Sequence, residues 1–201
     1  MIDEWLHAVT GSVWALPTLF ALVLGDSFLV VLPGEAAVTA FGALAVSTGS
    51  PPLALVIAVA AAAAVCGDAV LFFVGRSVGL ERWRWMRAPR AQTAFAWAAA
   101  RLQRSFGAVV FTARFIPFAR IAVNLTAGAA GVSAARFLAI DAVAATGWAA
   151  YQAVIGAVVG WVVPGGPAVA VLVSIGIALA LGFALDAAVA RVGRRRTQSG
   201  R

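Results

Sequence analysis

Apolar residues in this chain run in long blocks separated by short polar turns, a pattern typical of helices in contact with lipid. The blocks lie at residues 13–24, 28–47, 53–75, 106–130, 136–163 and 168–190. A helix needs roughly 20 apolar residues to cross a bilayer. The pattern therefore predicts membrane-spanning helices at 53–75, 136–163 and 168–190, whereas 13–24 is too short to span alone.

Two blocks, 28–47 and 106–130, are interrupted by proline. Pro33-Gly34-Glu35 lies in the first and Arg114-Phe115-Ile116-Pro117 in the second. Proline lacks a backbone donor and breaks a helix, and freed backbone at membrane depth must be covered by protein or water. We predict a re-entrant hairpin around Pro33, in preference to a continuous span over 13–32, and a second hairpin within 106–130.

Composition indicates the class of protein. The 201 residues are 63% hydrophobic and 11% charged, and the mean hydropathy is +0.97. These values predict an integral membrane protein. We expect one all-α polytopic domain over residues 1–190, with its core at 20–163, followed by a basic tail at 191–201. We expect no nucleic-acid partner.

Arginine is concentrated in the segment 76–104 and in the tail 191–201. Cytoplasmic loops of membrane proteins carry an excess of basic residues, so both segments and the C-terminus should lie in the cytoplasm of a bacterial inner-membrane protein. The segment 76–104 also contains tryptophans, and we expect it to lie on the membrane surface against anionic phospholipids.

The number of crossings between the two basic segments must be even. The helices 136–163 and 168–190 supply two, so 106–130 should enter and leave from the same side. A hairpin followed by a spanning helix then occurs twice, in opposite orientations. Inverted repeats with broken helices that meet near the midplane are a transporter architecture. The predicted fold has two oppositely oriented re-entrant hairpins and an inverted repeat.

Two like charges flank each interruption. Asp26 and Glu35 flank the first interruption, and Arg114 and Arg120 flank the second. A bare charge at the bilayer centre costs at least ~2.5 kcal/mol, so such residues line a pathway or pair with each other. Because the arginine fork matches the geometry of phosphate, we predict that the two arginines bind a phosphate group, with Asn124 as a further polar contact.

Proline near the arginines has a geometric role in this prediction. Residues six apart on an unbroken helix point about 240° from each other, so Arg114 and Arg120 would not converge. A kink at Pro117 allows both side chains to face one site. Pro33 and Gly128 are predicted to support the site, the glycine through a tight turn or a close backbone approach.

The acids are the predicted proton-coupling groups. A Glu35 that exchanges an arginine partner for a proton would couple phosphate release to protonation, and Asp26 would assist it. The alternative is a structural ion pair between Glu35 and Arg114. Asp68 is either a site residue or the partner of Arg76 in its own helix.

Asp141 is the remaining acid of the long apolar blocks before residue 164. It lies five residues after Arg136. We expect it to balance that arginine, which is a structural role.

These features resemble the DedA family of membrane proteins, which share the SNARE-associated or VTT domain. The resemblance covers about residues 20–160, and Arg114-Phe115-Ile116-Pro117 with Arg120 is its most specific element. The other matching residues are Asp26, Pro33-Gly34-Glu35, Gly42, Leu44, Ala45, Gly67-Asp68, Val74-Gly75-Arg76, Gly79, Ala127-Gly128 and Phe137. The chain departs from the family pattern at Asp26, where the family more often has Glu, and at Ala113, where Gly is common.

The resemblance implies lipid translocation driven by the proton-motive force, with an undecaprenyl phosphate-like carrier as the substrate. It also implies that Asp26, Glu35, Arg114 and Arg120 are the residues that the family uses. Eukaryotic relatives are similar to phospholipid scramblases, which is one alternative. A proton-coupled transporter of a small ion or metalloid is another.

An enzyme would need a nucleophile with a base, or a cluster of metal ligands. The only histidine, His7, lies outside the apolar blocks, and Cys66 has no evident base. We therefore predict a transporter, not an enzyme, with no cofactor and no bound metal. Gly156-x-x-x-Gly160 is a possible close-packing face between helices, compatible with a homo-oligomer.

Overall fold

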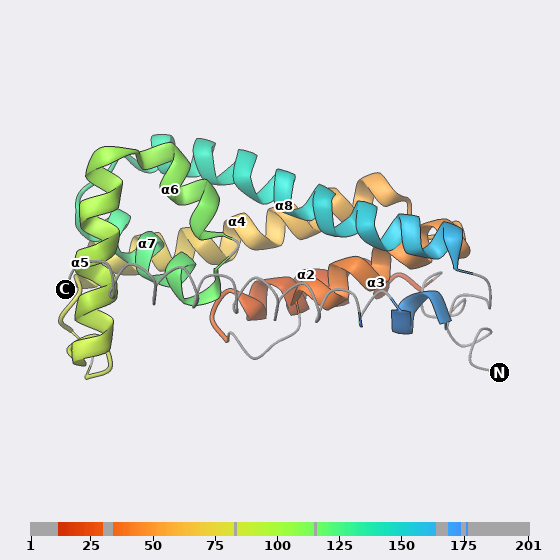
Figure 1. The fold of residues 1–201 in the computed structure, drawn as a ribbon, viewed down its shortest axis with the longest axis horizontal. Coiled ribbons are helices and arrows are strands. Elements are labelled where there is room, and N and C mark those ends of the chain that lie inside the picture. The colour runs from red at the N-terminus through yellow and green to blue at the C-terminus, as the bar shows by residue number, and fades with distance from the viewer. Residues whose placement is uncertain are drawn as a thin grey trace, which may run out of the picture.

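The computed structural model describes residues 12–29, 34–82, 84–114, 116–163, 169–173 and 176. Throughout these residues the regular structure is helical, which confirms the all-α prediction (Figure 1). The helices are α2 (Ala15–Asp26), α3 (Gly34–Ser47), α4 (Leu53–Val78), α5 (Pro89–Arg104), α6 (Phe106–Ala113), α7 (Pro117–Ala129) and α8 (Ala134–Val162).

The first interruption separates α2 from α3. Helix α2 ends at Asp26 and α3 begins at Gly34, so no helix continues through residues 13–32. Of the predicted hairpin at 28–47, the described helix is α3, and the block 13–24 lies mostly in α2. Pro33 lies outside the described residues.

The second interruption separates α6 from α7. Ala113 ends α6, and Ile116 has the extended backbone that a following proline favours (φ −127°, ψ 105°). Pro117 is then the first residue of α7, where its missing N–H leaves no helical hydrogen bond unmade. The prediction of a break inside 106–130 is confirmed.

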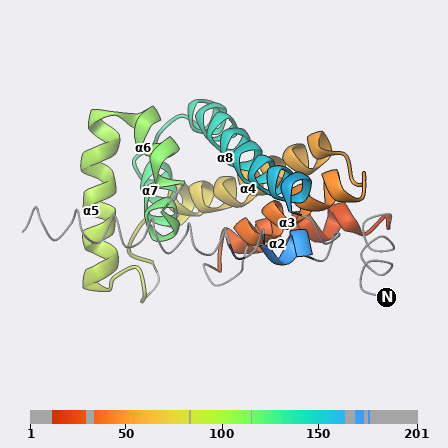
Figure 2. The ribbon, with the colours of Figure 1, turned by 45° about the vertical axis from the view of Figure 1, so that its right-hand side comes forward.

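The two short helix pairs enter the molecule from opposite ends. In Figures 1 and 2, α2 and α3 run in opposite directions on one side of the molecule's middle, and α6 and α7 do the same on the other side. The long helices α4 and α8 pass through both halves. Helix α3 packs along α8, α7 packs along α4, and α4 also contacts α8. The second helix of each pair therefore packs against the long helix that follows the other pair, whereas α2 contacts α4 and α6 contacts α8.

Two helices in the described residues, α4 and α8, are long and apolar enough to cross a membrane, and α2 and α3 are shorter apolar helices. The predicted spans at 53–75 and 136–163 correspond to α4 and α8. Of the predicted span 168–190, only residues 169–173 and 176 are described. The tail at 191–201 lies outside the described residues.

Glycines set the closest helix contacts. A Cβ atom at Gly42 of α3 would overlap the carbonyl oxygen of Ala153 on α8, and one at Gly156 of α8 would overlap that of Thr39 on α3. Gly160 faces the same helix, so the Gly156-x-x-x-Gly160 face is used inside this chain.

The same arrangement recurs in the other half of the molecule. A Cβ atom at Gly75 of α4 would overlap the carbonyl oxygen of Leu125 on α7, and one at Gly128 of α7 would overlap that of Phe72 on α4. The close backbone approach predicted for Gly128 is confirmed. Because a helix can approach a neighbouring backbone this closely only where its own residue lacks a Cβ atom, the glycines fix the packing of α3 on α8 and of α7 on α4.

Helix α5 lies across one end of the molecule, turned away from the long axis (Figures 1 and 2). Its buried side chains are Phe95, Ala98 and Leu102, a spacing of three to four residues that forms one apolar stripe. Arginines and half-exposed tryptophans cover the remaining surface of the segment, at Arg82, Arg84, Trp85, Arg87, Arg90, Trp97, Arg101 and Arg104.

Substitution at one of the contact glycines tests this packing. Gly156→Ala should lower the free energy of unfolding by about 1–3 kcal/mol, because the added methyl group forces α8 away from α3. Gly147→Ala, on the same helix, is the control: its Cβ atom would meet only Phe111 Cε2, at 3.8 Å. The control should leave stability unchanged or raise it slightly, since alanine favours helix more than glycine does. Thermal unfolding in detergent compares the two, and equal midpoints would contradict the packing.

Candidate functional site

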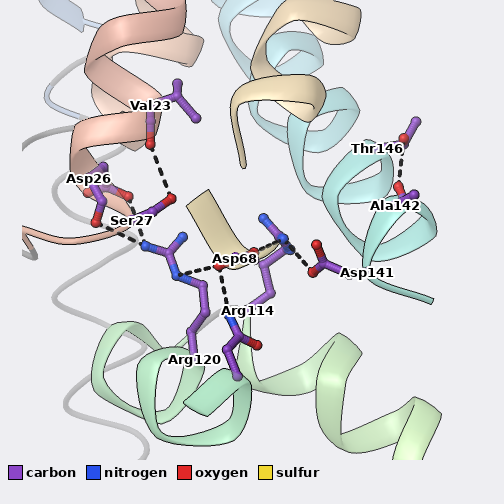
Figure 3. A network of polar contacts seen from close by, with 10 residues as sticks. Val23, Asp26, Ser27, Asp68, Arg114, Arg120, Asp141, Ala142 and Thr146 are labelled. Carbon is purple, nitrogen blue, oxygen red and sulfur yellow. Dashed lines mark hydrogen bonds and ion pairs between the residues drawn. The ribbon is translucent and has the colours of Figure 1, made fainter. Parts of the chain in front are cut away.

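Five charged side chains meet where the two helix breaks approach the middle of α4 (Figure 3). Asp26 ends α2, Asp68 lies within α4, and Asp141 lies within α8. Arg114 follows the last residue of α6, and Arg120 is in the first turn of α7. Segments far apart in the sequence therefore build one polar cluster inside an apolar molecule.

Arg114 lies between two carboxylates. Its Nη2 atom donates to Asp68 Oδ2 and to Asp141 Oδ1, the latter at 2.8 Å. The three side chains are 1–2% exposed. The guanidinium carbon also lies 5.9 Å from the centre of the Trp148 ring. A charge so deeply buried requires partners of opposite sign, and here α4 and α8 supply one each.

Arg120 connects the second helix break to the first. Its Nη2 atom donates to the backbone carbonyl of Asp26 at 3.0 Å and lies 3.3 Å from Asp26 Oδ2. Its Nε atom is 3.8 Å from Asp68 Oδ1. The carbonyls of a helix's last turn have no partner within the helix, and the arginine satisfies one of them at the end of α2.

Asp68 is the residue with the most partners in the cluster. Besides Arg114 and the nearby Arg120, it accepts a hydrogen bond from Asn124 Nδ2 at 2.8 Å. Arg120 and Asn124 are four residues apart on α7, which places them on one face of that helix. The residue before Asp68 is Gly67, where a Cβ atom would overlap the Ser27 side chain. Glycine there lets the end of α2 approach α4.

Several buried polar atoms of the cluster lack a hydrogen-bond partner among the described residues. They are Arg114 Nε and Nη1, Arg120 Nε and Asp141 Oδ2. Three carboxylates also face two guanidinium groups, which leaves one negative charge in excess when all five are ionised. The cluster therefore has N–H donors available to a ligand oxygen and one carboxylate oxygen with no donor.

The structure brings together the four residues that the sequence placed in one site, which are Asp26, Arg114, Arg120 and Asn124. Asp68 joins them. The carboxylates that ion-pair with Arg114 are Asp68 and Asp141. Glu35 lies half-buried in the first turn of α3. No group of three or more His, Cys, Asp or Glu side chains in the described part of the chain is placed to hold a metal ion.

The alternative left open for Asp68 is resolved. Asp68 belongs to the cluster, and Arg76 Nη1 instead donates to the carbonyl of Val132, at 3.1 Å.

The expected pairing of Asp141 with Arg136 is wrong. The Arg136 guanidinium lies over the Phe106 ring, at 4.9 Å, while Asp141 pairs with Arg114. Residues five apart on a helix point about 140° from each other, so the two side chains leave α8 in different directions. This angle is the signal in the sequence that could have placed Asp141 in the site.

A family model described as the VTT domain matches residues 32–158, more than half of the chain. The chain belongs to the VTT domain family. The match includes the helix break before Pro117, with Arg114 and Arg120, and it also includes Asp68 and Asp141. Asp26 lies just before its first residue. No curated protein and no solved structure matches the chain.

Membership in the VTT domain family gives this protein a general role as a membrane transporter, flippase-like in kind. The apolar helices α4 and α8 agree with a membrane location.

Removal of the Asp68 carboxylate tests how much the cluster contributes to the stability of the fold. Asp68→Ala should lower the free energy of unfolding by about 3–5 kcal/mol, because it leaves a buried guanidinium with too few partners. Glu81→Gln is the control, since that carboxylate is exposed between α4 and α5 and should leave stability unchanged. Chemical unfolding in mixed micelles measures both variants. A loss below about 1 kcal/mol in the alanine variant would contradict the pairing.

Proposed function

We propose that this VTT protein moves a phosphate-bearing lipid, of the undecaprenyl phosphate kind, across the bacterial inner membrane. The observation that carries the proposal is the pair of buried arginines at a helix break, with three guanidinium nitrogens that have no hydrogen-bond partner among the described residues. Guanidinium groups bind phosphate through two parallel N–H donors. The proposal is of transport without covalent chemistry, so the protein is a transporter and not an enzyme.

The proposal places the two helix pairs in the membrane as re-entrant hairpins of an inverted repeat. Their opposite directions of approach support this, as does the packing of α3 on α8 and of α7 on α4, each on the other half's long helix. Broken helices that meet near the midplane hold the substrate in transporters of this architecture. A lipid phosphate would meet the arginines at that depth while its chain stays in the bilayer.

The arginine-rich segment 76–104 would lie on the cytoplasmic surface, where anionic phospholipids contact it. The position of α5 across one end of the molecule supports this, because its apolar stripe packs inward and its arginines stay exposed. The positive-inside rule then places this end, and the basic tail with the C-terminus, in the cytoplasm.

Proton coupling in this proposal uses Asp26 and Glu35. Asp26 is already a partner of Arg120, and Glu35 is in the first turn of the helix on the other side of the same interruption. A phosphate that binds the arginines competes with carboxylates for the same donors. Protonation of a carboxylate removes the competitor, which links proton movement to phosphate binding.

The excess of carboxylates over arginines favours a second candidate, a proton-coupled transporter of a small ion. In that case the acids would bind the ion and the arginines would balance them. Transport of labelled lipid distinguishes the two candidates.

Leaflet exchange of labelled undecaprenyl phosphate in proteoliposomes tests the primary proposal. The wild-type protein should catalyse exchange that a pH gradient accelerates. Arg114→Lys should reduce the rate at least about tenfold, because lysine keeps the charge and loses the planar fork. Arg136→Lys is the control, since Arg136 is exposed and lies over Phe106, and it should exchange at the wild-type rate. Equal rates in the two variants would contradict a phosphate site at Arg114.

Replacement of Glu35 tests the coupling. Glu35→Gln should exchange lipid at a rate that no longer responds to the pH gradient, because the amide cannot take up or release a proton. The same assay with and without a gradient measures this. A gradient response equal to that of the wild-type protein would show that the proton moves elsewhere.

A further inference from the structure

Asp141 is the carboxylate of the cluster with the fewest partners. Its side chain is 2% exposed, and Oδ1 accepts one hydrogen bond, from Arg114 Nη2 at 2.8 Å. Oδ2 is buried without a donor. An ionised carboxylate oxygen in that position costs the full desolvation of its charge. A carboxylic acid would place its O–H there instead, and Oδ1 would still accept from Arg114.

The net charge of the cluster also indicates that one of its carboxylates binds a proton. Three aspartates face Arg114 and Arg120, so one bound proton makes the five side chains neutral. Buried charge is tolerated when it is paired, and the unpaired negative charge is the one that a proton removes.

Comparison of the three aspartates identifies where that proton lies. Asp68 contacts Arg114 and Asn124 and has Arg120 Nε within 3.8 Å. Asp26 pairs with Arg120 and is the most exposed of the three, at 14%. Asp141 accepts its hydrogen bond from Arg114, an arginine that it shares with Asp68.

The helices packed against α8 place few other charged side chains near Asp141. Helix α4 contributes Asp68 and Arg76, of which Arg76 binds the Val132 carbonyl. Helix α3 contributes Glu35. Arg114 follows α6, and Arg136 of α8 itself lies over Phe106. Arg114 and Asp68 are thus the charged groups that decide the ionisation of Asp141.

We propose that Asp141 binds a proton on Oδ2 and acts as a lock on Arg114. When Asp141 is neutral, Arg114 has one carboxylate partner, Asp68, and the Nε and Nη1 donors of Arg114 can bind a phosphate oxygen. When Asp141 is ionised, two carboxylates neutralise Arg114, which then binds phosphate weakly. The proton on Asp141 and the anion on Arg114 thus favour each other. The second half of this inference rests on the proposed function, and the first half does not.

The infrared spectrum of the purified protein tests the proton assignment without any ligand. At neutral pH the wild-type protein should show the carbonyl stretch of a buried protonated carboxylic acid, and Asp141→Asn should lack it. Asp141→Glu should keep the band at a shifted position, and Glu81→Gln should keep it unchanged. A wild-type protein without the band, or an Asp141→Asn variant that retains it, would overturn the proposal.

Binding of farnesyl phosphate across a pH series tests the lock. Wild-type affinity should fall as the pH rises, and at the alkaline end Asp141→Asn should bind about tenfold more tightly, because the amide mimics the neutral acid. Ionisation of the probe's own phosphate is the same in both proteins and cancels in their ratio. Identical pH profiles would overturn the lock.

The two arms separate this inference from the proposed function. If farnesyl phosphate binds neither protein while the infrared band depends on Asp141, the proton assignment holds and the phosphate-lipid proposal fails. Inorganic phosphate is the second probe. If it competes as strongly as farnesyl phosphate, the site recognises a free phosphate and the lock acts on that ligand.

Discussion

The pairing of Arg114 with Asp68 and Asp141 is the interaction on which the rest of the structure depends. A guanidinium group buried among apolar helices requires carboxylates, and these come from α4 and α8, the two longest helices described. The arginine itself stands at the break between α6 and α7. The pairing therefore fixes where the broken segment ends relative to both long helices, and it places Arg120 and Asn124 of α7 beside the same carboxylate.

The two helix breaks also depend on each other. Each break leaves backbone groups without helical partners, which is costly in an apolar environment. Arg120, at the start of α7, donates to the carbonyl of Asp26 at the end of α2. The charged side chain of one break thus satisfies the backbone of the other, while Asp26 supplies the countercharge. A polar cluster at this position is consequently part of the fold and is not simply inserted into it.

The sequence predicted the fold class, both interruptions and the long helices α4 and α8, because proline and apolar block length act locally. It placed Arg114, Arg120 and Asn124 in one site for the same local reason, the break before Pro117. The partners of these residues were harder to predict. Asp141 lies in an unbroken apolar helix, and only the packing of α8 against α4 and α6 brings it to Arg114.

The pairing of the first short helix was also hard to predict. Residues 13–24 are too short to cross a bilayer alone, and the contacts of α2 with α3 and α4 follow from tertiary packing. The glycine contacts are visible in the sequence as glycines, but their partner helices follow from tertiary packing alone.

Those glycine contacts determine which parts of the protein can move as units. Where backbone lies directly on backbone, sliding or rotation of one helix on the other is opposed by a clash, so we expect α3 to move with α8 and α7 to move with α4. Each of these two units combines the second helix of one short pair with the long helix that follows the other pair. Asp68 belongs to one unit and Asp141 to the other. An alternating movement would therefore open between these two aspartates, and Arg114 could remain with only one of them.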